Sequence, residues 1–199
     1  SSLGEMISNL SKLGINVPDG FAITSDAFND FLKDSGLDTS IEAELASLDV
    51  ENLDHLRRAG KKLRGMVSKA PLSKKLVADI KVEWEKISTE GKSFAVRSSA
   101  TAEDLPDASF AGQQETFLNI NGFDNLLEAI HKVYASLFTD RAISYRSLRG
   151  FEGELSISVG IQEMVRSDVG SSGVAFTLDT ESGYRGAIFV TSSYGLGAV

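Results

Sequence analysis

The sequence predicts an α+β fold, in which most of the helices precede most of the strands. Apolar residues recur at helical spacing through the first half of the chain, and after residue 154 they alternate with polar residues instead. Hydrophobic residues make up 42% of the 199 residues, which is enough to build a core. We therefore expect one domain over 1–199, with a helical part at 1–92 and a strand-rich part at 93–199.

Six helices are expected from the apolar periodicity and from residues that favour helix ends. Their ranges and boundary residues are 3–13 with Gly14 as a stop, 25–35 capped by Ser25-Asp26 and stopped by Gly36, 53–67 closed before Pro71, 74–87 capped by Ser73, 121–138 beginning at Asn121 or Asp124, and 139–145 capped by Thr139-Asp140.

Strands are expected where short apolar runs or period-two alternation stand between turn residues. Their ranges are 21–23, 93–97, 116–120, 155–162, 174–178 and 186–191. The last three follow one another with glycine-rich turns between them, so we expect them to form an antiparallel meander.

Charge and composition exclude several classes of protein. The 20 basic residues are outnumbered by 28 acidic ones, for a net charge of −8, which argues against nucleic-acid binding. No apolar run approaches the roughly 20 residues that span a bilayer, and no signal peptide opens the sequence, so no membrane association is expected. Without cysteine there is no disulfide or thiolate site, and a cytoplasmic location is compatible with that. Neither histidine has a partner at ligand spacing, so no metal site is expected in this chain.

Arg97 is the first candidate site residue. It ends the apolar run at 93–97, where a guanidinium is costly to bury without an anion. A polar loop rich in hydroxyl groups follows, and Gly112 then allows a close backbone approach before the next strand. An arginine facing such a loop can hold a polyphosphate. An ordinary surface loop, with Arg97 paired to Glu103 or Asp104, accounts for the same residues equally well.

Glu163 is the second candidate, because it occupies a position that the alternation of 155–161 predicts to be buried. Local rules tend to break at functional or strained positions. A strand end with a polar side chain and free backbone groups, beside Met164 and Val165, suits an adenine base. The simpler reading is that the strand has left the core and Glu163 points to water.

These residues belong to segments that are similar to a known family. The segment Val96–Leu118 resembles the signature of the N-terminal domain of phosphoenolpyruvate synthases (pyruvate, water dikinases), which phosphohistidine-type antibiotic kinases share. Further similar blocks follow in compatible order over essentially the whole chain, at 2–6, 17–24, 161–165, 172–177 and 193–197.

The resemblance implies one lobe of an ATP-grasp domain that binds ATP. Arg97 would contact the ATP phosphates as the catalytic residue of this lobe, and Gly112 and Thr116 would belong to the loop that covers them. Glu163, Met164 and Val165 would form the adenine-side strand. In the full-length synthase, ATP phosphorylates a histidine on a swivelling domain, and this histidine then converts pyruvate to phosphoenolpyruvate with release of AMP and phosphate.

The resemblance also implies that parts of the enzyme lie outside this sequence. The opening lysine of the family would precede Ser1, and the acidic ligands of Mg²⁺ would lie in a second lobe beyond Val199, with the phosphohistidine domain and the pyruvate-binding barrel. We therefore expect a fragment without dikinase activity of its own. The same lobe of an antibiotic (rifampin-type) phosphotransferase and a non-catalytic α+β interaction module remain alternatives. Pyruvate phosphate dikinase is less favoured, because the loop at 98–114 is closer to the synthase form.

Overall fold

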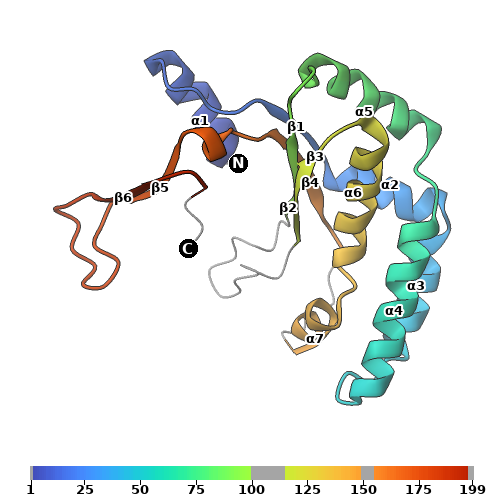
Figure 1. Ribbon diagram of the computed structural model, residues 1–199. Coiled ribbons are helices and arrows are strands. Elements are labelled where there is room, and N and C mark those ends of the chain that lie inside the picture. Colours follow the sequence, from blue (N-terminus) through green and yellow to red (C-terminus); the bar gives the residue numbers. More distant parts are fainter. Residues whose placement is uncertain (1, 100–114, 149–154, 197–199) are drawn as a thin grey trace. The chain divides into compact units, whose positions relative to one another are not determined.

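The computed structural model describes residues 2–99, 115–148 and 155–196. The chain divides into two compact units, Ser1–Met164 and Val165–Val199. In the first unit, helices α2 to α6 lie on one side of a four-stranded antiparallel sheet (Figure 1). The predicted α+β class is therefore confirmed.

The helices and strands follow the chain in this order. The first unit contains α1 (Ser2–Leu10), a 3-10 turn (Ser11–Leu13), β1 (Gly20–Ile23), α2 (Ser25–Asp34), α3 (Leu37–Ala46), α4 (Leu53–Lys69), α5 (Lys74–Ile87), β2 (Phe94–Ser99), β3 (Thr116–Ile120), α6 (Phe123–Ser136), α7 (Asp140–Leu148) and β4 (Ser158–Glu163). The second unit contains a 3-10 turn (Ser167–Val169), β5 (Ser171–Phe176) and β6 (Phe189–Tyr194).

The strand order in the first sheet is β1-β4-β2-β3, so β4 is inserted between two strands that precede it in the chain. Strand β4 takes a central place because Val159 and Ile161 are buried and need a covered face. The predicted meander is wrong: β4 pairs with β1 and β2, and β5 pairs with β6 in a separate two-stranded sheet.

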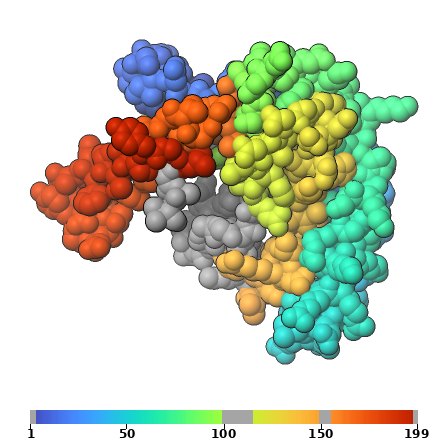
Figure 2. All heavy atoms as spheres, in the orientation of Figure 1, coloured from blue at the N-terminus to red at the C-terminus, as the bar shows by residue number. Residues whose placement is uncertain are grey.

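The core of the first unit lies between the helices and one face of this sheet. Val96 and Ile161 point into it from the strands, and Phe28, Leu63 and Ile130 meet them from α2, α4 and α6. All five side chains are at most 1% exposed. Helices α4 and α6 pack directly on each other, as the space-filling view shows in cyan and yellow (Figure 2). The helices therefore cover one face of the sheet.

Two predicted helix caps are confirmed and one is wrong. The hydroxyl oxygens of Ser73 and Thr139 accept hydrogen bonds from the backbone of α5 and α7, at 3.2 and 3.3 Å. Helix α2 is capped instead by Thr24, whose hydroxyl accepts from the amide of Ala27 at 3.4 Å. The residue with extended backbone serves as the cap, and here it stands one position before the predicted Ser25-Asp26. Helix α6 begins at Phe123, between the two predicted starting residues Asn121 and Asp124.

Helix α3 was not expected from the sequence. Gly36 does end α2, but its left-handed backbone (φ 64°) then leads directly into α3. The new helix buries only Leu37 and Ile41, so its apolar stripe is too short for periodicity to reveal it.

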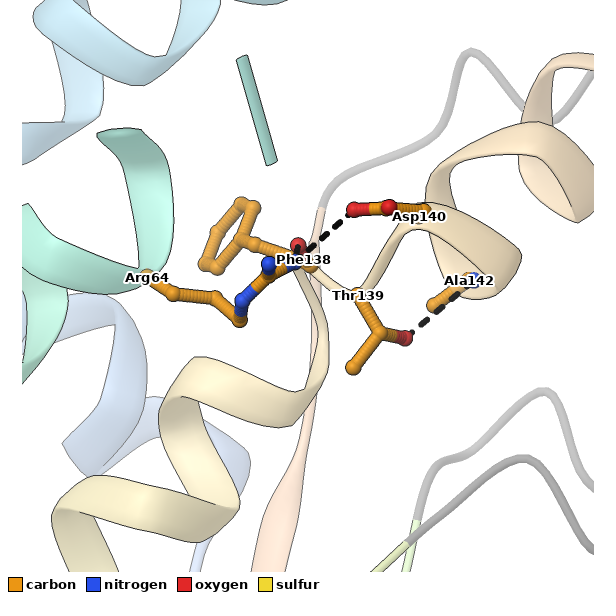
Figure 3. Close-up of polar contacts among 5 residues, drawn as sticks. All are labelled: Arg64, Phe138, Thr139, Asp140 and Ala142. Carbon is orange, nitrogen blue, oxygen red and sulfur yellow. Dashed lines mark hydrogen bonds and ion pairs between the residues drawn. The ribbon is translucent and has the colours of Figure 1, made fainter. Parts of the chain in front are cut away.

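The joint between α6 and α7 is held by an arginine from α4. One guanidinium nitrogen of Arg64 donates to the carbonyl oxygen of Phe138 at 2.7 Å and to the Asp140 carboxylate at 3.1 Å (Figure 3). Gly60 lies one helical turn earlier, and a Cβ atom there would stand 2.5 Å from Asp140 Oδ1. The bare backbone of Gly60 therefore lets the start of α7 approach α4.

The second unit consists mainly of the β5–β6 hairpin. Its six paired positions run from Ser171 opposite Tyr194 to Phe176 opposite Phe189. Every residue of β6 is exposed, including Phe189 and Val190. Among the described residues of both units, no helix is long and apolar enough to cross a membrane.

Candidate functional site

The face of the sheet opposite the core carries small and polar side chains. Pairing places Ala22, Gly160, Arg97 and Thr116 in one row across β1, β4, β2 and β3. Alternation along each strand puts these residues on the opposite face from Val96 and Ile161. Because three members of the row are small, the only long side chain on it is that of Arg97. We call this row the arginine row.

Arg97 is exposed and lies along the sheet surface. Strand β2 continues to Ser99, so the prediction that Arg97 ends the strand is wrong; it is the fourth of six residues. A Cβ atom at Gly160 would lie 3.6 Å from Arg97 Cγ, which shows that the stem of the arginine passes over this glycine. No carboxylate of the described residues forms an ion pair with Arg97. The alternative partners Glu103 and Asp104 lie outside the described residues, as does Gly112.

The arginine row has the chemistry of an anion site. A guanidinium is charged at every physiological pH and presents its donors in a plane that matches two oxygens of a phosphate. The exposed hydroxyl of Thr116 stands opposite Arg97 in the β2–β3 register and adds a neutral donor. Small neighbours leave room for a ligand to approach the backbone.

Glu163 points away from the arginine row. It lies three positions along β4 from Gly160, on the core side of the strand, where its carboxylate accepts a hydrogen bond from Lys92 Nζ at 2.7 Å. The two side chains are 27% and 36% exposed, so Glu163 is a half-buried ion-pair partner rather than a residue turned to water.

Two backbone amides at the end of β4 already form hydrogen bonds within the protein. The amide of Glu163 donates to the carbonyl of Asp19, and the amide of Met164 donates to the carbonyl of Ser93, both at 2.9 Å. The expectation of free backbone groups therefore fails for these two amides. Met164 follows the last residue of β4, and its sulfur accepts a hydrogen bond from the amide of Asn119 at 3.1 Å. Val165 begins the second unit.

The structure thus brings two predicted residues, Arg97 and Thr116, into direct register. It places Met164 directly after β4, in contact with Asn119 of β3. Sequence reasoning missed Lys92 and Asn119, which hold Glu163 and Met164. A signal for Lys92 was available, because a glutamate at an inward position needs a cation within reach. The left-handed backbone of Asn119, with φ 58°, had no comparable signal.

Two buried titratable side chains lie on the helices α6 and α7. The Tyr134 hydroxyl and one Arg146 nitrogen are buried with no hydrogen-bond partner in the described part of the chain. Burial raises the pKa of Tyr134 above its usual range and lowers the pKa of Arg146 to about 10. Across residues 2–99, 115–148 and 155–196, no three His, Asp or Glu side chains gather as metal ligands would.

Comparison with known proteins identifies the family. Residues 1–199 match the profile described as "Pyruvate phosphate dikinase, AMP/ATP-binding domain". The chain is 58% identical to a phosphoenolpyruvate synthase of Neisseria meningitidis serogroup B and 52% identical to those of Pseudomonas aeruginosa and Escherichia coli. Each alignment covers 99% of this chain, which spans about 25% of the length of each relative. The chain belongs to the pyruvate phosphate dikinase AMP/ATP-binding domain family.

Proposed function

We propose that this chain is the N-terminal nucleotide-binding part of a phosphoenolpyruvate synthase, and that the arginine row receives the phosphates of ATP. The full-length enzyme would use ATP to phosphorylate a histidine on another domain and then convert pyruvate to phosphoenolpyruvate. Support comes from a family match over the whole chain and from the three relatives named above, each of which is called a phosphoenolpyruvate synthase.

The observation that carries the proposal is the exposed guanidinium of Arg97, which has no ion-pair partner among the described residues. It lies over Gly160 in a row of small residues, and no described carboxylate neutralises it. The small neighbours in the row would let a polyanion approach this guanidinium, whose planar donors match the oxygens of a phosphate. The exposed hydroxyl of Thr116 in the same row fits a second contact to phosphate.

Arg97 would act through charge. Phosphoryl transfer depends mainly on positioning and on neutralising the charge of the transferred group. The guanidinium of Arg97 can contribute to both, because it is charged at every physiological pH and presents its donors in one plane. Mg²⁺ would be held by residues outside this chain.

The test measures ATP binding and steady-state turnover in the full-length enzyme that carries this sequence. We expect Arg97→Ala to lower kcat/KM for ATP by about 10²-fold or more, since a charged contact in the transition state contributes several kcal/mol. Arg97→Lys should recover only part of the loss, because an ammonium cannot contact two phosphate oxygens as a guanidinium does. Thr116→Val should have a smaller effect in the same direction.

Arg57→Ala is the matched control, since Arg57 is also exposed but lies on α4, away from the arginine row. Unchanged kinetics in both arginine variants would refute the proposal and favour a non-catalytic interaction module. Phosphorylation of an antibiotic in place of pyruvate, with the Arg97 effect retained, would keep the nucleotide site and replace the synthase assignment.

A further inference from the structure

Strand β3 contains one residue more than a regular pairing with β2 would need. The residue pairs between the two strands are Phe94 with Ile120, Val96 with Phe117, and Arg97 with Thr116. In a regular antiparallel pair, each step along one strand matches one step along the other. Here the two steps from Phe94 to Val96 match three steps on β3, so Leu118 and Asn119 together face Ala95. This arrangement is a β-bulge.

The extra residue of the bulge is accommodated at Asn119. Its backbone is left-handed, with φ 58°, and no other non-glycine residue in the described part of the chain has a positive φ. Asparagine adopts this conformation more readily than most residues do. The Asn119 amide donates to the Met164 sulfur at 3.1 Å, and its carbonyl accepts from the side-chain amide of Asn121 at 3.0 Å. Both backbone groups therefore have partners outside the β2–β3 ladder.

The bulge determines which side chains of β3 face the helices. Phe117 and Ile120 both pack against the core of the first unit, and Lys132 Nζ of α6 lies 5.8 Å from the centroid of the Phe117 ring. Leu118, which lies between them, is 54% exposed. Residues three positions apart on a regular strand project from opposite faces. The extra residue therefore lets both Phe117 and Ile120 reach the core.

A regular strand with the same sequence would be displaced by one residue. If Ile120 kept its partner, the pairs would be Phe94 with Ile120, Val96 with Leu118, Arg97 with Phe117, and Ser98 with Thr116. Because paired residues project from the same face, the Phe117 ring would enter the arginine row and the Thr116 hydroxyl would turn to the core side. Leu118 would replace Phe117 in the core. Both registers thus satisfy the apolar pattern, and the bulge selects the one that places Thr116 opposite Arg97.

We propose that Asn119 is a positioning residue that keeps the Thr116 hydroxyl in the arginine row by holding the bulge. This inference rests on the proposed function, in which Thr116 contacts a phosphate of ATP. Asn119 acts through the register of β3 and not by contact with the nucleotide. Loss of the bulge would remove a neutral donor from the arginine row and put an aromatic ring beside the guanidinium.

The experiment measures kcat/KM for ATP in the full-length enzyme with substitutions at Asn119. The β-branched side chain of valine is poorly compatible with a left-handed backbone and favours a regular strand. We expect Asn119→Val to lower kcat/KM by about tenfold or more, since a hydrogen bond to a charged phosphate is lost. Asn119→Gly accepts the left-handed backbone freely, so kcat/KM should stay within about twofold of wild type.

Deletion of Asn119 is the matched control, because it removes the bulge without displacing the register. The shortened strand can pair regularly while Thr116 stays opposite Arg97 and Phe117 stays opposite Val96. Its melting temperature should fall, since the hydrogen bond to the Met164 sulfur is lost. Its kcat/KM for ATP should nevertheless stay within about threefold of wild type, because the register is kept.

Melting temperatures of these variants separate a structural role from a positioning role. A purely structural Asn119 would lower the melting temperature of the valine and deletion variants and leave kcat/KM unchanged in both, which would overturn the inference. Equal losses of kcat/KM in these two variants would also contradict it, since the register would then not be the cause.

Two further variants decide the question if either of these does not fold. Asn119→Ala disfavours the left-handed backbone less strongly than valine and takes its place. Asn119→Gly takes the place of the deletion, and a loss of kcat/KM as large as that of the valine or alanine variant would refute the inference. If Arg97→Ala has no effect, the proposed function fails. If Arg97→Ala lowers kcat/KM while Asn119→Val does not, only the inference about Asn119 fails.

Discussion

Replacing Gly60 with alanine should destabilise the protein, although the same change in most helices is favourable. Gly60 lies within α4, where alanine is preferred over glycine by about 0.8–1 kcal/mol. At this position the new Cβ atom would stand 2.5 Å from Asp140 Oδ1, 2.9 Å from a guanidinium nitrogen of Arg64 and 3.2 Å from the Phe138 carbonyl oxygen. The carboxylate and the guanidinium would both have to move.

The cost of that movement can be assembled from the contacts at the α6–α7 joint. Arg64 donates to the Phe138 carbonyl at 2.7 Å, a hydrogen bond that contributes about 1 kcal/mol. Its ion pair with Asp140 has both side chains more than a third exposed, so it contributes well under 1 kcal/mol. Crowding of a packed joint adds about 1–3 kcal/mol. After the helix-propensity gain is subtracted, we expect Gly60→Ala to lower the free energy of unfolding by about 1–3 kcal/mol.

Gly65→Ala in the same helix is the matched control, because nothing lies within 4 Å of the Cβ atom it would add. It should raise the free energy of unfolding by about 0.5–1 kcal/mol. The assay is equilibrium urea unfolding followed by circular dichroism. Combining Gly60→Ala with Asp140→Ala should recover part of the loss, since the closest obstructing atom is gone. Equal stabilisation by both glycine replacements would refute the steric argument.

Three further results are expected. At neutral pH, Tyr134→Phe should leave the free energy of unfolding unchanged or raise it by about 1 kcal/mol, because the buried hydroxyl has no hydrogen-bond partner among the described residues. Burial raises the pKa of Tyr134 in the folded state only. In alkaline titrations above about pH 10, the wild type should therefore lose stability faster than the variant. Hydrogen bonds from Arg166 lower the pKa of Asp168, so their contribution to stability should be present above about pH 4 and be lost on further acidification. Carbon NMR titration should show the pKa of Asp168 rising toward its ordinary value in Arg166→Gln, and an unchanged pKa would contradict this. A double-mutant cycle with Lys92→Met and Glu163→Gln should give a coupling of about 0.2–1 kcal/mol, and a coupling near zero would show that the contact does not persist in solution.

Much of the secondary structure could be predicted because its causes are local. The helices that became α4, α5 and α6 carry long apolar stripes, and Ser73 and Thr139 cap helices through hydrogen bonds to residues three positions away. Helix α3 was missed because it buries only two apolar residues. The meander was wrong because pairing partners are chosen by burial, and β5 and β6 bury almost nothing.

The candidate site was also predictable from the sequence only in part. Arg97 and Glu163 were singled out because a charge within an apolar run is visible in sequence, and that reasoning located both strands of the site. It could not place the two residues on opposite faces of the sheet, nor find Lys92 as the partner of Glu163, since these positions lie 71 residues apart in sequence. The roles of Gly112 and Val165 stay predictions.

The order of amino acids by itself determined the α+β class, most helix boundaries and the family, because periodicity, capping and ordered motifs are read over a few neighbouring residues. Only the tertiary structure decided that β4 enters between β1 and β2, and that its Gly160 supports the stem of Arg97. It also decided that a left-handed Asn119 meets Met164. Such contacts join residues far apart in the chain, and they form only when the burial of one sheet face sets the register of every strand.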